Sequence, residues 1–339
     1  MMTQPVPSFR ATHAMLLNAH LPQIIANALD IGLFDFLSKG PMTAPDIADS
    51  LKVEESALRA LMKILITAGY MTAKEGRFSL SAEGESYFVT SSPAYQGGIL
   101  QAMIGMKDLF CQGGTLLKSG CAPHNDQMWA STAMMEMMGQ SAQGGKVQSV
   151  VGFLSSLPEF SSMRRMCDIA GSYGYYAMGI LDASKEMTAD VYDLPEVSNL
   201  GRPIIEKRGY AERLTMRDVD LEGEWDLEQG YDLVFVANYL YRWSTDSRII
   251  DFLKKVHGAL NPGGVFLSCH MTSEVEGVHH LSQQVMEYAT RLGGYPTHKI
   301  TEVRMARILE ESGFVNFSIQ RPGDASYDNT LMVAARKPV

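Results

Sequence analysis

The heptapeptide Asp168-Ile169-Ala170-Gly171-Ser172-Tyr173-Gly174 separates a short apolar run from an amphipathic stretch that begins at residue 175. Glycines at 171 and 174 let a chain turn sharply and start a helix close to a ligand. The heptapeptide therefore predicts a strand, a tight turn and a helix, which is the entry unit of an open α/β sheet.

The rest of residues 161–339 repeats this alternation of short apolar runs and amphipathic stretches, which is typical of a parallel sheet covered by helices. We expect an α/β, Rossmann-like domain with seven strands. The predicted strands are 166–170, 189–192, 214–216, 233–237, 265–269, 317–319 and 331–335, and the predicted helices are 175–183, 198–208, 246–259 and 301–312.

Residues 1–95 have helical periodicity and a different plan. A first helix breaks at Gly32, Thr43 is a predicted N-cap ahead of Asp46, and a further helix runs to Gly69. Glu75-Gly76 predicts a hairpin loop between two short strands. We expect a mostly helical, winged-helix-like domain here, followed by a helical linker and pocket wall at residues 96–160.

The net charge of −9 opposes binding to nucleic acid or to an anionic membrane. The candidate DNA-reading helix offers only Arg59 and Lys63 as basic residues. Scattered cysteines, no signal peptide and no apolar run of roughly 20 residues predict a cytoplasmic chain without membrane insertion or a metal site. The expected partner is a small molecule.

Acidic residues follow the second and third predicted strands, at the edge where parallel sheets bind ligands. Asp193 could accept hydrogen bonds from both hydroxyls of a ribose, and Asp218 could receive an adenine amine. Each could also be an ordinary solvated turn residue. Met134 and Met138, in a methionine-rich segment, are either core filler or a plastic wall of a pocket.

Nearly the whole chain resembles the S-adenosylmethionine-dependent O-methyltransferases of phenolic and natural-product metabolism, which pair a winged-helix dimerisation domain with a Rossmann-like catalytic domain. The resemblance implies a homodimer that forms through the N-terminal domain. It rests on the segments Ile31-Gly32-Leu33-Phe34-Asp35-Phe36-Leu37, Arg59-Ala60-Leu61-Met62-Lys63-Ile64-Leu65, Asp193-Leu194-Pro195, Asn238-Tyr239-Leu240-Tyr241-Arg242-Trp243, Ala259-Leu260-Asn261-Pro262-Gly263-Gly264 and Glu311-Ser312-Gly313-Phe314.

Carried over by position, the resemblance implies S-adenosylmethionine as the cofactor. The implied cofactor-binding residues are Asp168, Gly171, Tyr173, Gly174, Asp193, Asp218 and Val219. The predicted substrate-pocket residues are Met134, Met138, Trp243, His280 and Lys299.

The chain departs from the family pattern at the general base, which is usually a histidine and here is Tyr241. A phenol is a poor base at neutral pH unless its pKa is strongly perturbed. Tyr241 could donate a hydrogen bond instead, and His270 could act as the base from the other wall. An acidic acceptor would need no strong base, because methyl transfer from a sulfonium depends mainly on in-line positioning.

The sequence thus predicts a methyltransferase acting on a small aromatic or conjugated molecule, by O-methylation or, given Tyr241, by C-methylation. One alternative is a relative that binds the cofactor but catalyses decarboxylation, hydroxylation or rearrangement. A ligand-responsive DNA regulator and a nicotinamide oxidoreductase are further alternatives, which the acidic charge and the missing GxGxxG motif respectively oppose.

Overall fold

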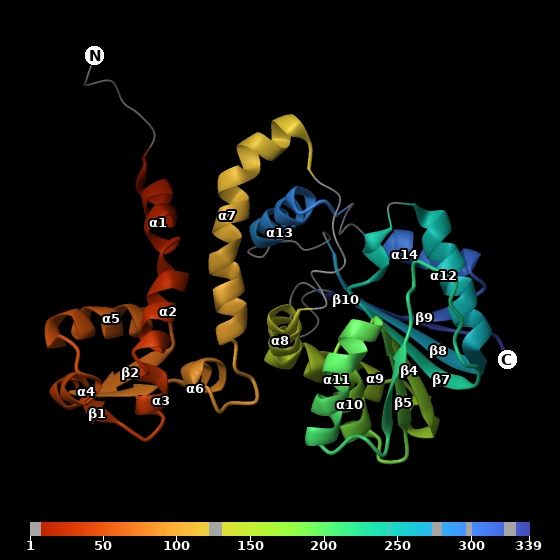
Figure 1. The fold of residues 1–339 in the computed structure, drawn as a ribbon, viewed down its shortest axis with the longest axis horizontal. Helices are drawn as coiled ribbons and strands as arrows, with labels where there is room; N and C mark the ends of the chain where they lie inside the picture. Colours follow the sequence, from red (N-terminus) through yellow and green to blue (C-terminus); the bar gives the residue numbers. More distant parts are fainter. Residues whose placement is uncertain (1–7, 122–130, 244, 273–279, 296–299, 322–329) are drawn as a thin grey trace. The chain divides into compact units, whose positions relative to one another are not determined.

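The computed structural model in Figure 1 describes residues 8–121, 131–243, 245–272, 280–295, 300–321 and 330–339. The chain forms two compact units, residues 1–107 and 108–339. None of the described helices combines the length and apolarity needed to cross a membrane. The division into functional segments at residues 95 and 160 stays a prediction.

The first unit has the predicted winged-helix order. Thr43 caps a helix, because its hydroxyl accepts the Asp46 N–H, and Glu75 and Gly76 both have positive φ, as a tight two-residue hairpin turn requires. Three short strands pair antiparallel in the order β1-β3-β2. The elements are α1 (Arg10–Asn18), α2 (Leu21–Asp30), α3 (Leu33–Leu37), β1 (Met42–Thr43), α4 (Ala44–Leu51), α5 (Glu55–Thr67), β2 (Met71–Lys74), β3 (Arg77–Leu80), α6 (Ala82–Phe88) and the start of α7 (Gly97–Ser119).

The second unit contains the large sheet, and every strand predicted from the sequence occurs in it. Four described helical segments lie between α7 and the sheet: α8 (Thr132–Ser141), the π-helical turn η2 (Ala142–Lys146), α9 (Val147–Ser155) and the 3₁₀ helix η3 (Phe160–Ser162). The sheet and its helices are β4 (Arg165–Ile169), α10 (Tyr175–Ala183), β5 (Thr188–Asp193), α11 (Pro195–Lys207), β6 (Leu214–Asp218), β7 (Tyr231–Ala237), α12 (Asp246–Ala259), β8 (Leu260–Met271), α13 (His280–Leu292), α14 (Glu302–Glu311), β9 (Val315–Gln320) and β10 (Thr330–Arg336).

The strand order is β6-β5-β4-β7-β8-β10-β9. The first five strands are parallel, and β10 is antiparallel to both of its neighbours. Helices α9, α10 and α11 cover one face, where Phe153 and Ile180 pack on Phe235; α12 and α14 cover the other. Since β4 lies where the strand order reverses, the turn after β4 occupies the usual ligand position of such sheets.

Candidate functional site

The turn between β4 and α10 is tightly wound. Ala170, Ser172 and Gly174 all have φ between 55° and 75°, the left-handed region. At Gly171 a Cβ atom would lie 2.7 Å from Cγ of Asp168 and 2.7 Å from Cγ1 of Val191. Only glycine fits there, because the turn passes directly over the carboxylate that ends β4.

Asp168 is a buried acid without a protein partner. It is 1% exposed, and neither carboxylate oxygen has a hydrogen-bond partner within the part of the chain that the structure describes. Burial raises its pKa well above the ordinary value, and the negative charge of Asp193 raises it further, while the nearby backbone N–H of Ala177, too poorly placed for a hydrogen bond, acts in the opposite direction. A buried polar group is costly unless it is paired. The site therefore suits a ligand that brings a hydrogen-bond donor or a positive charge.

Asp193 ends β5 beside this turn. Its Oδ2 accepts the Ser172 N–H at 2.7 Å, and its Oδ1 accepts the Leu194 N–H at 2.8 Å. A carboxylate offers about four lone-pair sites, so each oxygen can accept one more donor, such as a ribose hydroxyl. Burial raises the pKa of Asp193 to about 6, while the two backbone N–H groups act in the opposite direction.

Asp218 ends β6 at the register position next to Asp193. The following residue, Val219, donates its N–H to the Asp193 carbonyl oxygen at 2.8 Å, which joins the two strand ends. The Asp218 side chain is 46% exposed and pairs with Arg202 at 2.6 Å. The structure thus brings Asp168, Asp193 and Asp218 to one edge of the sheet, with Val219 between the last two.

Helix α8 borders the same turn. Tyr173, 1% exposed, forms a small apolar cluster with Met135 and Val197, and Met134 and Met138 pack partly buried against it. The two predicted pocket methionines therefore lie beside the turn. Their role toward an acceptor stays a prediction.

Trp243 belongs to a different cluster. It is 5% exposed, its ring lies 5.3 Å from that of Tyr239 and 5.2 Å from that of Phe252, and its indole N–H donates to Glu222. It packs in the core under α12. The structure does not group Trp243 with Met134 and the other residues of the α8 cluster.

His270, in β8, is enclosed by protein. It is 1% exposed, its Nε2 lies 3.2 Å from the carbonyl oxygen of Ile300, and its Nδ1 lies 2.9 Å from the Ser268 hydroxyl. A carbonyl only accepts, so Nε2 carries the proton and Nδ1 accepts the Ser268 O–H. Burial lowers the pKa of His270 to about 4. At neutral pH it is an uncharged imidazole with both nitrogens bonded.

The remaining predicted residues are only partly described. Tyr241 lies in the short 3₁₀ helix Leu240–Arg242 that follows β7, and its side chain lies outside the described structure. His280 begins α13, with its side chain likewise outside the description, and Lys299 falls wholly outside the described residues.

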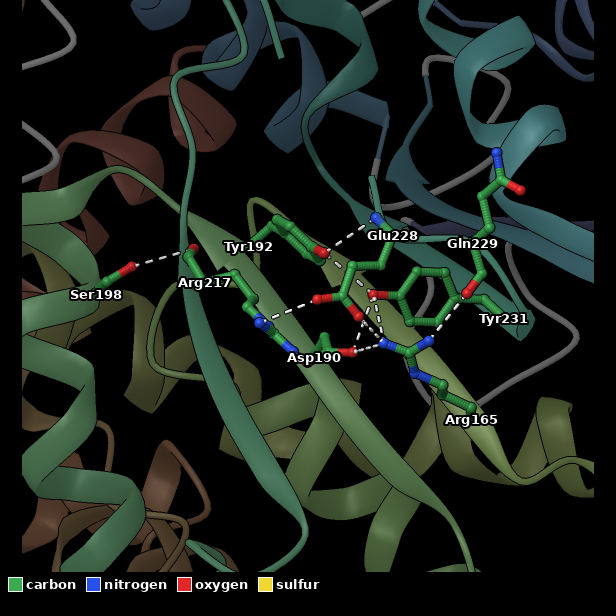
Figure 2. A network of polar contacts seen from close by, with 8 residues as sticks. All are labelled: Arg165, Asp190, Tyr192, Ser198, Arg217, Glu228, Gln229 and Tyr231. Carbon is green, nitrogen blue, oxygen red and sulfur yellow. Dashed lines mark hydrogen bonds and ion pairs between the residues drawn. The ribbon is translucent and has the colours of Figure 1, made fainter. Parts of the chain in front are cut away.

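Sequence reasoning missed a polar network centred on Asp190, in the middle of β5 (Figure 2). Asp190 is 5% exposed and accepts hydrogen bonds from Arg165 and Arg217 at 2.8 and 2.9 Å and from the Tyr231 hydroxyl at 2.9 Å. Burial raises the pKa of Tyr231, so its hydroxyl stays protonated and can donate. The signal in the sequence that could have predicted this network is the acidic Asp190 within an otherwise apolar predicted strand, 189–192.

The network reaches the two strand ends that carry Asp193 and Asp218. Glu228 pairs with both guanidinium groups, at 3.1 Å from Arg217, and Arg217 directly precedes Asp218. The Ser198 hydroxyl, in the first turns of α11, lies 3.3 Å from the Asp193 carbonyl oxygen and 3.5 Å from that of Arg217. These contacts hold the ends of β5 and β6 side by side.

Lys146 is a second residue that the sequence did not single out. It ends η2, and its Nζ donates to the Ser141 hydroxyl at 2.8 Å. Burial lowers its pKa, and the thiol of Cys269, near the end of β8, acts in the opposite direction.

The described residues fit S-adenosylmethionine. The buried, unpartnered carboxylate of Asp168 suits a cofactor that carries an ammonium and a sulfonium charge. The glycine at 171 leaves room for close approach of the turn, and the oxygens of Asp193 retain acceptor capacity for ribose hydroxyls.

Comparison with known proteins gives two family matches. The O-methyltransferase domain matches residues 130–315, and the O-methyltransferase dimerisation domain matches residues 14–91. The first match alone covers more than half of the chain.

Individual relatives are distant in sequence, but the match covers most of this chain and most of each relative. The N,N-dimethyltransferase OxyT of Streptomyces rimosus is 23% identical over 91% of this chain and 92% of its own length. The 3-hydroxy-5-methyl-1-naphthoate 3-O-methyltransferase of Streptomyces sahachiroi is 23% identical over 72% of each protein.

Solved structures share the fold. Human N-acetylserotonin methyltransferase in complex with S-adenosylmethionine superposes with a TM-score of 0.77, at 18% identity and over the full length of both chains. This chain belongs to the O-methyltransferase family and is an S-adenosylmethionine-dependent methyltransferase.

Proposed function

We propose that this enzyme methylates an oxygen atom of a small aromatic or conjugated molecule. The observation that carries the proposal is the buried, unpartnered Asp168 carboxylate under the glycine turn, with Asp193 beside it. One relative supports the acceptor class, because it is named for the O-methylation of a naphthoate; another is named for N,N-dimethyl transfer, which makes nitrogen a candidate atom as well. A tyrosine C(3)-methyltransferase of Streptomyces lavendulae, 20% identical over 78% of this chain, makes carbon a further candidate atom.

In this proposal Asp168 offers its carboxylate to the cationic end of the cofactor, and Asp193 accepts the ribose hydroxyls. Asp218 and Val219 border the adenine, and Tyr173 and Gly174 shape the turn. When bound, S-adenosylmethionine would supply a methyl group on a positively charged sulfur, and the sulfur would leave as a neutral thioether when an acceptor lone pair bonds to the methyl carbon in line. The protein's contribution is to fix the two reactants in line and to exclude water.

We assign the acceptor side to Tyr241 and treat His270 as a positioning residue of β8. The assignment of His270 rests on its bonds to Ser268 and Ile300, which leave neither ring nitrogen available to an acceptor proton. Tyr241 follows β7, the central strand next to β4. As a hydrogen-bond donor it would orient an acidic hydroxyl, for which no strong base is needed.

The test is incubation with methyl-labelled S-adenosylmethionine and a panel of hydroxylated, aminated and carbon-nucleophilic aromatic compounds, followed by product mass and fragmentation. We expect one labelled methyl group on an acceptor oxygen. Consumption of an acceptor without a gain of label would contradict methyl transfer, and label on carbon or nitrogen would replace the oxygen assignment.

Replacing Tyr241 by phenylalanine is expected to lower kcat about 10- to 100-fold for the best acceptor of that panel, because one oriented hydrogen bond near the reacting atoms is lost. Affinity for S-adenosylhomocysteine, measured by calorimetry, should stay the same. Wild-type turnover in the variant would remove Tyr241 from the mechanism.

We also propose that the protein is a homodimer that forms through its N-terminal unit. The dimerisation-domain match supports this, as do three exposed apolar residues on α1, a helix with no buried residue: Met15, Leu16 and Leu17, 59%, 53% and 59% exposed. Exposed apolar patches of this kind commonly mark interfaces. Light scattering at micromolar concentration should give twice the chain mass, and Leu16→Asp with Leu17→Asp should give the chain mass. A wild-type monomer would refute the proposal.

A further inference from the structure

A side-chain hydrogen bond joins the cofactor turn to α8, in addition to the packing of Tyr173 on that helix. The hydroxyl of Ser172 lies 3.2 Å from the sulfur of Met135 and donates to it. Met135 is 3% exposed and packs with Tyr173. The backbone N–H of the same Ser172 donates to Asp193 at 2.7 Å. Ser172 therefore touches the ribose-binding acid with its backbone and α8 with its side chain.

Ser172 is an unfavourable residue for its backbone conformation. Its φ of 55° lies in the left-handed region, which glycine adopts without steric cost and most other residues avoid. A serine here lowers the stability of the fold relative to glycine unless its side chain makes a compensating contact. The hydroxyl contact with Met135 is the one that the structure provides.

A close backbone approach at a second point brings α8 against the segment that follows the turn. At Gly139, one turn further along α8 than Met135, a Cβ atom would lie 2.3 Å from the Tyr175 ring. Tyr175 is the first residue of α10, directly after the turn. The helix thus contacts the turn at Ser172 and the residue that directly follows the turn, and it carries the predicted pocket residues Met134 and Met138.

We propose that Ser172 is a positioning residue that couples cofactor binding at Asp193 to the placement of α8, the wall of the acceptor pocket. The identification of α8 as that wall rests on the proposed function. Ribose hydroxyls arriving at Asp193 fix the Ser172 backbone, and the fixed Ser172 hydroxyl holds Met135 and with it α8. The acceptor pocket of this enzyme is then completed by the bound cofactor.

The test is amide hydrogen exchange, with S-adenosylhomocysteine as the ligand because it requires no known acceptor. In the wild type, saturating ligand should slow exchange in two segments, residues 168–175 and 132–141. Ser172→Ala keeps the backbone N–H but removes the hydroxyl. We expect it to bind the ligand within about threefold of wild type and to lose about three- to tenfold of the slowing in 132–141, as expected for one hydrogen bond.

Met135→Leu preserves the volume of the side chain and removes the sulfur acceptor. It should lose the slowing in 132–141 to the same extent as Ser172→Ala, and the double variant should lose no more than either single variant. Additive losses would show that the two side chains act separately and would overturn the proposal.

Ser172→Gly separates coupling from stability. It relieves the left-handed strain, so its unfolding midpoint should rise by about 1–3 °C, yet its α8 segment should respond to ligand as weakly as that of Ser172→Ala. If Ser172 had only a structural role, its replacement would change the unfolding midpoint and the ligand response of α8 in the same direction. Ala170→Gly is the matched control, because Ala170 also has a φ of 55°; it should gain stability and keep the ligand response of α8.

Ligand-induced slowing in residues 132–141 that is as large in Ser172→Ala as in the wild type would overturn the proposal. So would ligand binding in the wild type, seen by calorimetry, without slowing in that segment. Absence of binding in the calorimeter would instead refute the cofactor site itself and the coupling with it, so failure of the coupling and failure of the proposed function are distinguishable.

Discussion

Replacing Asp193 by alanine is expected to weaken binding of S-adenosylmethionine and S-adenosylhomocysteine at least about 100-fold, by calorimetric titration at neutral pH. Two ribose hydroxyls would lose a charged acceptor, and each such hydrogen bond contributes about 1.5–3 kcal/mol. The backbone N–H groups of Ser172 and Leu194 would also lose their partner. Asp193→Asn keeps one acceptor oxygen, so its affinity should lie between that of the wild type and that of Asp193→Ala. Unchanged affinity in the alanine variant would refute the placement of the ribose.

The pH dependence of the same titration gives an independent check. The pKa of Asp193 is raised from its ordinary value of 3.8 to about 6, chiefly by burial. Below about pH 6 the free enzyme carries a protonated Asp193, so affinity should fall about tenfold between pH 7 and pH 5. In Asp193→Ala only the pH dependence that comes from the raised pKa of Asp168 should remain. A wild-type affinity that is flat over this range would contradict the role of the carboxylate.

The raised pKa of Asp193 affects folding stability in the opposite direction from ligand affinity. Because the folded state binds the proton more tightly than the unfolded chain, the charged Asp193 lowers stability above about pH 6, and this cost is relieved as pH falls from 6 toward 3.8. Affinity and stability therefore respond in opposite directions to acid at this residue. An acid held at a cost to stability is typical of a binding site.

Local patterns were sufficient to predict the elements of the fold. The helix Tyr175–Ala183 has its predicted bounds because Gly174, in the left-handed region, starts it at a fixed place. The helix Asp246–Ala259 also has its predicted bounds. In contrast, β8 begins at Leu260 rather than at 265. Leu260 pairs with Tyr231 and Val265 pairs with Leu233, so residues 261–264 form an irregularity in the pairing with β7, and Gly263 lies in the left-handed region.

Only the part of the site that lies at the ends of strands could be predicted from the sequence. Asp168 lies near the end of β4, and Asp193 and Asp218 end the neighbouring parallel strands β5 and β6, so their meeting at one edge is a consequence of topology. The contact between Ser172 and Met135 spans 37 residues, and no periodicity relates the two. The two bonds that enclose His270 depend equally on distant packing, with Ile300 supplied by a segment 30 residues away. Such contacts depend on tertiary placement.

Gly171 is the position where the smallest change should have the largest effect. In Gly171→Ala the new methyl group would lie 2.7 Å from both the Asp168 carboxyl carbon and a Val191 methyl, and 2.8 Å from an Asp168 oxygen. Carbon atoms do not approach this closely, so the turn or the carboxylate must move. Val191 is fully buried in a close-packed sheet, which leaves the turn as the part that yields.

We expect Gly171→Ala to lower affinity for S-adenosylhomocysteine at least about 100-fold, because a displacement of roughly 1 Å in a binding site has consequences of this order. Overpacking should also lower the free energy of unfolding by about 1–3 kcal/mol, measured by denaturant titration. The control is Gly152→Ala in α9, where a Cβ meets no atom within 4 Å and a gain of about 0.5–1 kcal/mol is expected from the helix interior.

Comparing the two variants separates the tight turn from a general effect of adding a methyl group. If Gly171→Ala binds the ligand as the wild type does, the turn tolerates a side chain, and the close approach to Asp168 is not required for the cofactor. If it binds weakly while Gly152→Ala binds normally, the loss belongs to the turn. The Asp168 carboxylate, buried and without a protein partner, then depends on the glycine above it for access to the cofactor.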